Sequence, residues 1–160
     1  MELDCRLRHA NASDAAFFAI LYASTRRAEM AATGWSQAVQ DAFLAQQHDA
    51  QHRHYRALHA AADWWVIEHS GDPAGRLILQ DDGRELLIVD LALLPPYRNR
   101  AIGTAILSDI RDFADAEGRA VRLSVAVTNP ARSLYERMDY VPVEDGGMHI
   151  QMRYTPPSMR

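Results

Sequence analysis

One stretch of this sequence, residues 85–127, constrains the fold more than any other. Residues 85–94 are almost continuously apolar, which predicts a strand covered on both faces. Residues 101–117 then carry apolar side chains at helical spacing and end at Gly118, and residues 121–127 alternate as a second strand. A strand, a crossover helix and a second strand form a β-α-β unit, so the sheet should contain one parallel strand pair.

The patterns on either side of this unit indicate how the sheet is completed. Two helical segments precede it: one starts at Ser13 or Asp14 and is broken at Gly34, and the next starts at Ser36 and ends before Asp63. Turn signals join the other strands, so most strand pairs should be antiparallel. The sequence predicts an α/β (α+β) fold with a mixed, mostly antiparallel central sheet flanked by helices. The expected strands are 5–9, 64–68, 75–80, 85–94, 121–127, 140–143 and 148–154.

Helical spacing also predicts which side chains face the core. In the first helix Ile20 is expected on the inward face, beside Leu21. In the second helix the apolar positions include Val39 and Leu58, and in the third helix Phe113 is expected to point inward.

Length and composition limit the class of protein. A chain of 160 residues is expected to form a single domain, residues 1–160. The net charge is −4 and the basic residues are scattered, so no nucleic-acid surface is expected. Cys5 is the only cysteine, which is typical of a reducing compartment, and its context favours a packing role. Residues 1–8 lack an apolar signal core and no apolar run approaches about 20 residues, so we expect a cytoplasmic protein that does not bind membranes.

The segment from Asp90 to Thr104 has the pattern of an anion site. A strand runs into a turn with two arginines, and a helix begins there with small residues. Free backbone N–H groups at a helix start attract a phosphate, and the helix dipole adds to that attraction. Small side chains allow close approach of the backbone, while Arg98 and Arg100 can neutralise the charge. We therefore predict a pyrophosphate-binding loop.

These residues resemble motif A of the GNAT acetyltransferase superfamily, whose core reads Gln/Arg-x-x-Gly-x-Gly/Ala. Arg98, Ala101 and Gly103 occupy its fixed positions, and residues 129–140 resemble motif B, in which an Asn contacts the cofactor arm and a Tyr reaches its sulfur. The resemblance implies a β-α-β core that binds acetyl-CoA as co-substrate. The cofactor-binding residues that it implies are Leu91, Leu93, Leu94, Arg98, Asn99, Arg100, Ala101, Ile102, Gly103, Thr104, Asn129 and Ser133.

The sequence departs from this pattern at three positions where the family often has glycine. Asn99 and Asp139 stand at two of them, and these residue types tolerate a left-handed backbone better than other non-glycine residues. Ala101 stands at the third. We expect Ala101 to fit only with a negative φ and with its methyl group directed away from the phosphate.

The resemblance also implies a mechanism of direct transfer to an amine in a ternary complex. Tyr135 stands where the family has its acid and would donate a proton to the leaving thiolate, although a packing role is the alternative. A strand N–H near Leu93 would polarise the thioester oxygen. Asp90 interrupts an apolar strand and is a candidate base, but the same carboxylate could pair with an arginine for structure alone.

The acceptor site is expected near the end of the first helix, because the family commonly builds it from the first two helices. Arg26, Glu29 and Trp35 lie there, with Glu29 as a second candidate base, and a helix-end salt bridge beside a packed Trp is the alternative. His48 and His52 are spaced i, i+4, as metal ligands often are. Their polar neighbours favour a solvated helix face, so no metal is expected.

Together these patterns predict an acetyl-CoA-dependent N-acetyltransferase that acts on a primary amine of a small molecule or peptide. The alternative is a non-catalytic acyl-CoA-binding or sensing module. The presence of Tyr135 and Asp90 favours the enzyme over this alternative. The sequence leaves open the acceptor, the length of the acyl group and whether the chain forms a homodimer.

Overall fold

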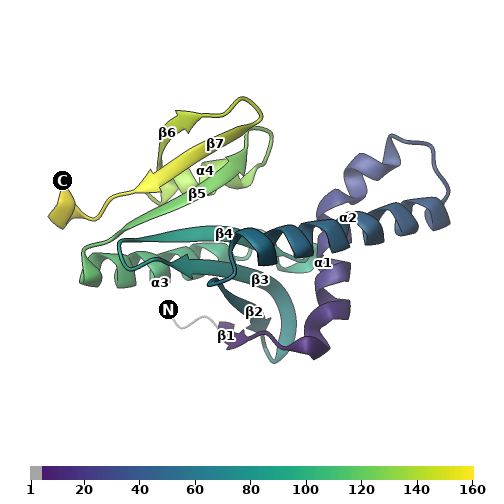
Figure 1. Ribbon diagram of the computed structural model, residues 1–160, viewed down its shortest axis with the longest axis horizontal. Coiled ribbons are helices and arrows are strands. Elements are labelled where there is room, and N and C mark those ends of the chain that lie inside the picture. Colours follow the sequence, from purple (N-terminus) through teal and green to yellow (C-terminus); the bar gives the residue numbers. More distant parts are fainter. Residues whose placement is uncertain (1–4) are drawn as a thin grey trace.

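A seven-stranded sheet with the order β1-β2-β3-β4-β5-β7-β6 forms the centre of the structure (Figure 1). The computed structural model describes residues 5–160 apart from the side chains of Cys5 and Asp145, so the packing role expected for Cys5 lies outside the described part. The strands are β1 Cys5–His9, β2 Asp63–His69, β3 Asp72–Asp81, β4 Glu85–Leu93, β5 Ala120–Ala126, β6 Val141–Asp145 and β7 His149–Tyr154. The helices are α1 Ala15–Ala31, α2 Gln37–Leu58, α3 Ile102–Glu117 and α4 Ala131–Arg137, and short 3-10 turns cover Ala12–Asp14, Pro95–Tyr97 and Pro157–Met159.

The predicted fold class and the β-α-β unit are confirmed. β4 and β5 are parallel and are connected through α3, whereas the other neighbouring strands are antiparallel. Two helices start or end where a local signal predicts: Ser36 caps α2, and Gly118 ends α3 in the left-handed conformation. Among residues 5–160, no helix is long and apolar enough to cross a membrane.

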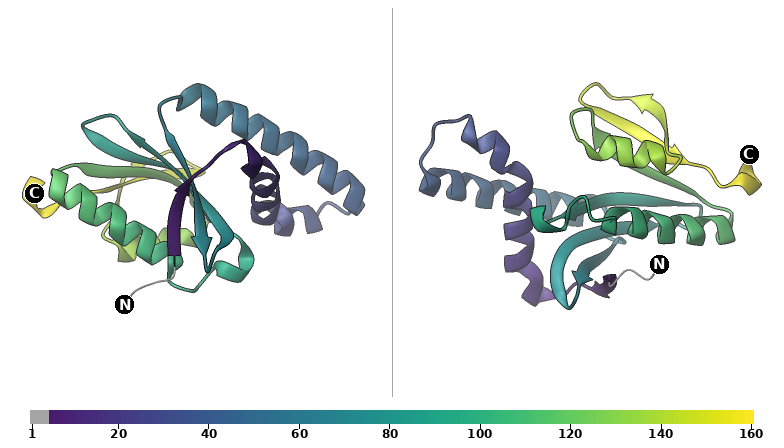
Figure 2. Two further views of the ribbon diagram at one scale, coloured as in Figure 1. Left: turned by 90° about the horizontal axis from the view of Figure 1, so that it is seen from below. Right: turned by 180° about the vertical axis from the view of Figure 1, so that it is seen from behind.

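Helices cover both faces of the sheet (Figure 2). α3 and α4 pack on one face through the main apolar core, which includes Ile106, Leu107 and Tyr135. α1 and α2 lie over the other face, where Phe18 packs with Trp64 in a smaller cluster. The junction of α1 and α2 extends beyond the sheet, as the upper right of Figure 1 shows. It has a core of its own, built from Tyr22, Met30 and Leu44.

Four side chains expected to face inward are exposed. The buried face of α1 contains Phe18, Leu21 and Tyr22, and that of α3 contains Ile102, Ile106, Leu107, Ile110 and Ala114. The buried face of α1 is rotated from the predicted one. The buried face of α3 largely agrees with the prediction but is narrower than the apolar stripe, so Phe113 at the edge of the stripe stays exposed. The exposed residues are Ile20, Val39, Leu58 and Phe113.

A β-bulge in the middle of β4 changes which face its side chains occupy. Ile78 is opposite Asp90 and Leu79 is opposite Ile88, so Val89 is an extra residue without a partner on β3. Before the bulge, Ile88 points into the α3 core, and strict alternation would send Asp90 to the same side. The extra residue shifts the alternation. Asp90 therefore lies on the α1–α2 face, while Leu91 returns to the α3 face.

Candidate functional site

β4 and β5 stay paired for only part of their length. Their parallel pairing runs from Glu85–Ala120 to Ile88–Leu123, although β4 continues to Leu93. In Figure 1, β5, β6 and β7 diverge from the other strands beyond this point. Leu94 donates its N–H to Ala74 of the β3 side at 2.8 Å. N–H directions alternate along a strand, so the N–H groups of Leu91 and Leu93 point away from β3. They point to the edge of β4 that β5 no longer covers.

The loop that follows β4 presents a row of unused backbone donors. Within residues 5–160, the N–H groups from Asn99 to Thr104 donate to no protein acceptor, whereas Arg98 N–H bonds Pro95 and Ala105 N–H bonds Ala101. Consecutive N–H groups in such a turn, followed by a helix start, form a concave binding site for an anion. This geometry fits the pyrophosphate of acetyl-CoA.

Left-handed residues give the loop this shape. Asn99 of the loop has φ 58°, and Asp139, which follows α4 outside the loop, has φ 70°, as their residue types predicted. Ala101 has φ 63° and ψ 9° and directly precedes α3, so the expectation of a negative φ at Ala101 is wrong. The turn that directs the N–H groups of the loop requires a left-handed residue at position 101. Ala101 adopts this conformation although its Cβ makes it sterically unfavourable.

The two loop arginines contact the protein's own carbonyl groups. Arg98 donates from Nε to the Leu93 carbonyl at 2.9 Å and so ties the loop to the end of β4. Arg100 donates from Nη1 to the Pro96 carbonyl at 3.4 Å, and its guanidinium lies 5.8 Å from the Tyr97 ring centroid. Both side chains are exposed, so their remaining N–H groups face solvent. Charge neutralisation by these arginines stays a prediction.

The start of α4 lies against the start of α3. A Cβ added to Gly103 would sit 3.2 Å from Leu134 Cδ2, so the small residue also serves helix packing. Asn129 accepts the Ala131 N–H at 2.9 Å, and Pro130 occupies the N-cap position of α4. Ser133 donates its hydroxyl to the Pro130 carbonyl. Asn129 and Ser133 are exposed at this helix start, and their contact with a cofactor is untested.

Tyr135 is buried between α4 and the sheet. Its side chain is 7 % exposed and its ring lies 5.8 Å from that of Tyr140. Burial and, to a lesser extent, the negative charge of Asp90 raise the pKa of Tyr135 to about 12. The hydroxyl therefore stays protonated at neutral pH.

Asp90 forms the ion pair that the sequence left open as an alternative. Its Oδ2 accepts N–H groups from Arg76 Nε at 2.9 Å and from Nη2 at 2.7 Å. The Arg76 side chain is 3 % exposed and that of Asp90 is 21 % exposed. Arg76 was not among the expected site residues, although a single arginine within the apolar run 74–79 was a signal for it. Whether Asp90 also acts as a base is untested.

Arg26, Glu29 and Trp35 come together at the α1–α2 junction. Arg26 Nε bonds Glu29 at 2.9 Å, and its guanidinium lies 5.9 Å from the Phe43 ring centroid. Trp35 meets the same Phe43 ring edge-on at 5.4 Å. Arg26 and Glu29 form the helix-end salt bridge of the alternative, whereas Trp35 stays 43 % exposed beside Phe43. A contact of these residues with the acceptor stays a prediction.

His48 and His52 do not lie on a solvated helix face. His48 is 7 % exposed and packs 5.6 Å from the Tyr22 ring, and His52 lies 5.0 Å from the Trp64 ring. The inward face of α2 is polar here because it lies over the buried Arg76. Burial and the positive charge of Arg76 lower the pKa of His48, with a smaller contribution from His52. Among the described residues, no three His, Cys, Asp or Glu side chains gather to hold a metal.

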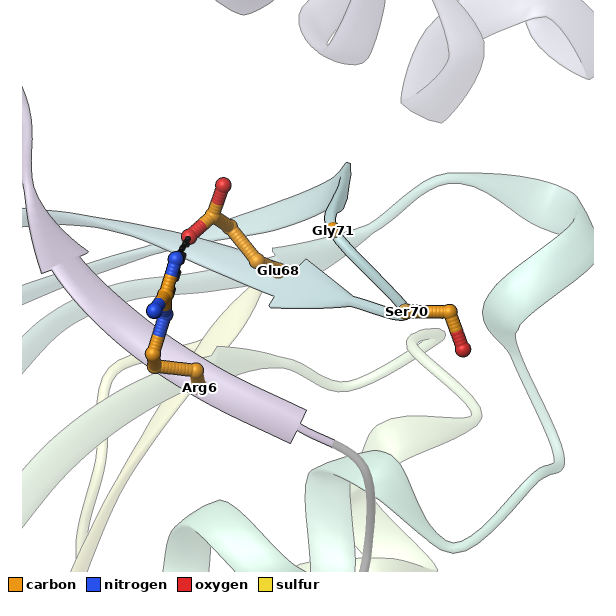
Figure 3. Close-up of a pocket in the computed structure, with 4 residues that line it drawn as sticks. All are labelled: Arg6, Glu68, Ser70 and Gly71. Carbon is orange, nitrogen blue, oxygen red and sulfur yellow. Dashed lines mark hydrogen bonds and ion pairs between the residues drawn. The ribbon is translucent and has the colours of Figure 1, made fainter.

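A cavity of about 230 Å³ lies elsewhere, at the edge of the sheet (Figure 3). It is lined by Arg6, Glu68, Ser70 and Gly71, and Arg6 bonds Glu68 across it at 3.0 Å. Glu68 also pairs with Arg8 at 3.5 Å. None of these residues belongs to the loop after β4, and this ion-paired cavity is separate from the candidate site.

The strand that leaves its neighbour and the donor-rich loop after it define an acyl-CoA-dependent transferase. The sequence profile of the Acetyltransferase (GNAT) family matches residues 26–140, which is more than half of the chain. The protein belongs to this family, whose members transfer an acetyl group from acetyl-CoA. No curated protein sequence matches the chain significantly.

Solved structures of acetyltransferases share the fold. A PaiA N-acetyltransferase from Thermoplasma acidophilum in complex with coenzyme A has 14 % identity and a TM-score of 0.71, covering 97 % of this chain and 99 % of that chain. A GCN5-related N-acetyltransferase from Rhodopseudomonas palustris has 22 % identity and a TM-score of 0.65, with 97 % of each chain covered. The spermidine N-acetyltransferase from Vibrio cholerae, in complex with CoA and spermine, has 18 % identity and a TM-score of 0.65, covering 98 % and 97 %.

Proposed function

We propose that this protein transfers the acetyl group of acetyl-CoA directly to a primary amine of a small molecule or peptide. One observation supports the proposal best: β4 leaves β5 after Ile88 and runs straight into the loop of unused N–H groups from Asn99 to Thr104. The N–H groups of Leu91 and Leu93 at the strand edge suit the amide groups of a pantetheine arm. Those of the loop suit the pyrophosphate at its other end.

Bound acetyl-CoA supplies an activated acetyl thioester. In this proposal, a backbone N–H near Leu93 donates to the carbonyl oxygen as negative charge develops there. The amine nitrogen forms the new C–N bond, the C–S bond breaks, and the sulfur keeps the electron pair. The nitrogen becomes cationic and acidic as it bonds. We assign its proton to Asp90, which lies beside Leu91 on the face covered by α1 and α2.

Tyr135 is proposed to stabilise the leaving thiolate. With its pKa raised to about 12, full proton transfer to a thiolate of pKa about 8.5 is uphill by roughly 5 kcal/mol. A hydrogen bond from the protonated hydroxyl carries no such cost. Tyr135 therefore acts as a hydrogen-bond donor during C–S cleavage, and the sulfur is protonated from solvent afterwards.

The proposed acceptor is an amine because several of the solved neighbours are named N-acetyltransferases. The neighbour from Vibrio cholerae was solved with spermine, which supports a small-molecule amine. Arg26, Glu29 and Trp35 are proposed to contact the acceptor from the α1–α2 junction. A peptide acceptor is the second form of the same proposal.

The first prediction tests the pyrophosphate loop through ligand-induced stabilisation. Acetyl-CoA should raise the Tm of the wild-type protein by mass action. Thr104 is exposed in the first turn of α3, where Thr104→Glu places a carboxylate beside the phosphate but suits the helix dipole. We expect Thr104→Glu to lose most of the Tm shift and to keep the stability of the free protein. Thr104→Gln, of equal size and uncharged, is the control, and equal shifts in both variants would contradict the assignment.

A turnover screen separates the enzyme from a binding module. Wild-type protein and acetyl-CoA are incubated with monoamines, polyamines, amino acids and peptides, and free thiol and acetylated product are measured together. Product in any arm supports the proposal. A clear Tm shift with acetyl-CoA but no product in any arm would identify the protein as a non-catalytic acyl-CoA-binding module.

A further inference from the structure

The Arg76–Asp90 ion pair has a geometry that a purely structural pair does not need. Both donating nitrogens of Arg76 bind the same carboxylate oxygen, Oδ2 of Asp90. Oδ1 accepts no hydrogen bond from another described residue. A pair that serves structure alone gains more from the two-oxygen fork, in which each oxygen takes one N–H group. The arrangement commits one oxygen to Arg76 and leaves the other available.

Of the two paired side chains, the carboxylate is the one that is partly exposed to solvent. Arg76 keeps 3 % of its side chain exposed, whereas Asp90 keeps 21 %. The β-bulge at Val89 places Asp90 on the α1–α2 face, where β4 has just left β5. The next residue, Leu91, directs its N–H toward the edge that β5 has left. The exposed part of Asp90 thus lies beside the proposed transfer point.

Three other elements hold the Arg76 guanidinium in place. It lies 5.2 Å from the Phe18 ring centroid of α1 and 5.4 Å from the Trp64 ring centroid of β2. Nη2 also donates to Gln51 of α2 at 3.4 Å. A planar guanidinium between aromatic rings has little freedom to reorient. Arg76 is therefore fixed before any ligand binds, by the same helices that cover this face.

We propose that Arg76 is a positioning residue, which holds Oδ2 of Asp90 so that Oδ1 faces the amine nitrogen. The proposal rests on the proposed function, because it assigns to Asp90 the proton that the nitrogen loses. Arg76 itself touches no reacting atom. Its role is to fix the carboxylate within the narrow range of positions from which proton transfer succeeds.

The first test changes the geometry and keeps the charge. Arg76→Lys retains a cation but has one nitrogen where Arg76 uses two, so the carboxylate loses its fixed orientation. With an acceptor found in the turnover screen, we expect kcat to fall by about 10- to 100-fold while the KM for acetyl-CoA stays within about twofold. Arg119→Lys is the matched control, because Arg119 also gives two nitrogens to one carboxylate, Asp81, at the far end of β3. It should keep wild-type kcat.

The second test keeps both Arg76 and Asp90 and changes a neighbour of Arg76 instead. Gln51→Glu gives Arg76 a competing carboxylate at the 3.4 Å contact and adds an ion pair, so folding should not suffer. We expect unchanged or higher Tm together with lower kcat. Gln47→Glu, one turn earlier on the same helix, adds the same charge without a contact to Arg76 and should keep kcat.

A double-mutant cycle shows whether Arg76 acts through Asp90. If it does, Arg76→Lys should lower kcat no further once Asp90→Asn has removed the carboxylate. Losses that multiply in the double variant, or wild-type kcat in folded Arg76→Lys and Gln51→Glu, overturn the positioning role and leave the proposed function standing. Absence of wild-type turnover with every acceptor contradicts the proposed function itself, and the positioning role with it.

Discussion

Two neighbouring tyrosines have the same buried setting but different expected roles. Tyr135 and Tyr140 are both buried, with ring centroids 5.8 Å apart, and the Tyr140 hydroxyl has no hydrogen-bond partner among the described residues. Of these two, Tyr135 alone has a pKa that the charge of Asp90 helps to raise. At the scale of single residues, the hydroxyl of Tyr135 is the one that the proposed reaction uses.

Tyr135→Phe should therefore lower kcat by about 100-fold, because it removes the hydrogen-bond donor to the leaving thiolate, and should leave folding and the acetyl-CoA Tm shift intact. Tyr140→Phe is the control. It removes a buried polar group that has no partner, so stability should be equal or higher and kcat should be unchanged. Steady-state kinetics and thermal unfolding of the two variants decide the matter, and wild-type kcat in Tyr135→Phe would leave that residue a packing role alone.

At the scale of elements, the loop before α3 has the most unusual backbone. Asn99 and Ala101 are both left-handed, and the latter position costs about 1–2 kcal/mol for a residue with a Cβ. The strain lies where the N–H groups are aimed at the proposed ligand, so the loop shape is kept at some expense of stability.

Ala101→Gly should relieve this strain. The gain is partly offset by the greater freedom of glycine in the unfolded chain, so we expect the free energy of unfolding to be unchanged or higher by up to about 1 kcal/mol. Ala105→Gly, one turn later inside α3, should lower it by about 1 kcal/mol because there glycine only loses helix propensity. Urea unfolding of both variants provides the measurement. Equal losses would show that Ala101 is unstrained.

At the scale of the whole molecule, α2 packs on the sheet through polar as well as apolar side chains. His48 is buried beside Tyr22 of α1 and His52 of α2, and the charge of Arg76 on β3 acts on it. Asp49 has the opposite but smaller influence. The lowered pKa means that the folded protein resists protonation of His48 more than the unfolded chain does.

This linkage predicts a loss of stability on acidification. Above the unfolded pKa of about 6.5, both states hold neutral His48 and stability does not depend on it. As the pH falls below that value, the unfolded chain takes up the proton first, so the free energy of unfolding decreases until the folded pKa is passed. Urea midpoints at about pH 7.5 and about pH 5.5 should differ less in His48→Gln than in wild type. His54→Gln, exposed on the same helix, should keep the wild-type difference.

The sequence by itself determined what depends on neighbours along the chain. The β-α-β unit follows from apolar periodicity within residues 85–127. The donor-rich loop and the left-handed Asn99 and Asp139 follow from local backbone sterics, which residue type controls. The fold class, the donor-rich loop and the family resemblance were therefore predictable without a structure.

Only the tertiary structure decided which side chains meet across the layers. The bulge at Val89 depends on the register between β3 and β4, and no local signal shows that it sends Asp90 to the α1–α2 face. Arg76 binds a carboxylate 14 positions away and a glutamine 25 positions away, and its charge makes the face of α2 that buries His48 polar. Register and layer packing are set by contacts among distant segments, and a one-residue shift in a strand reverses every side chain after it.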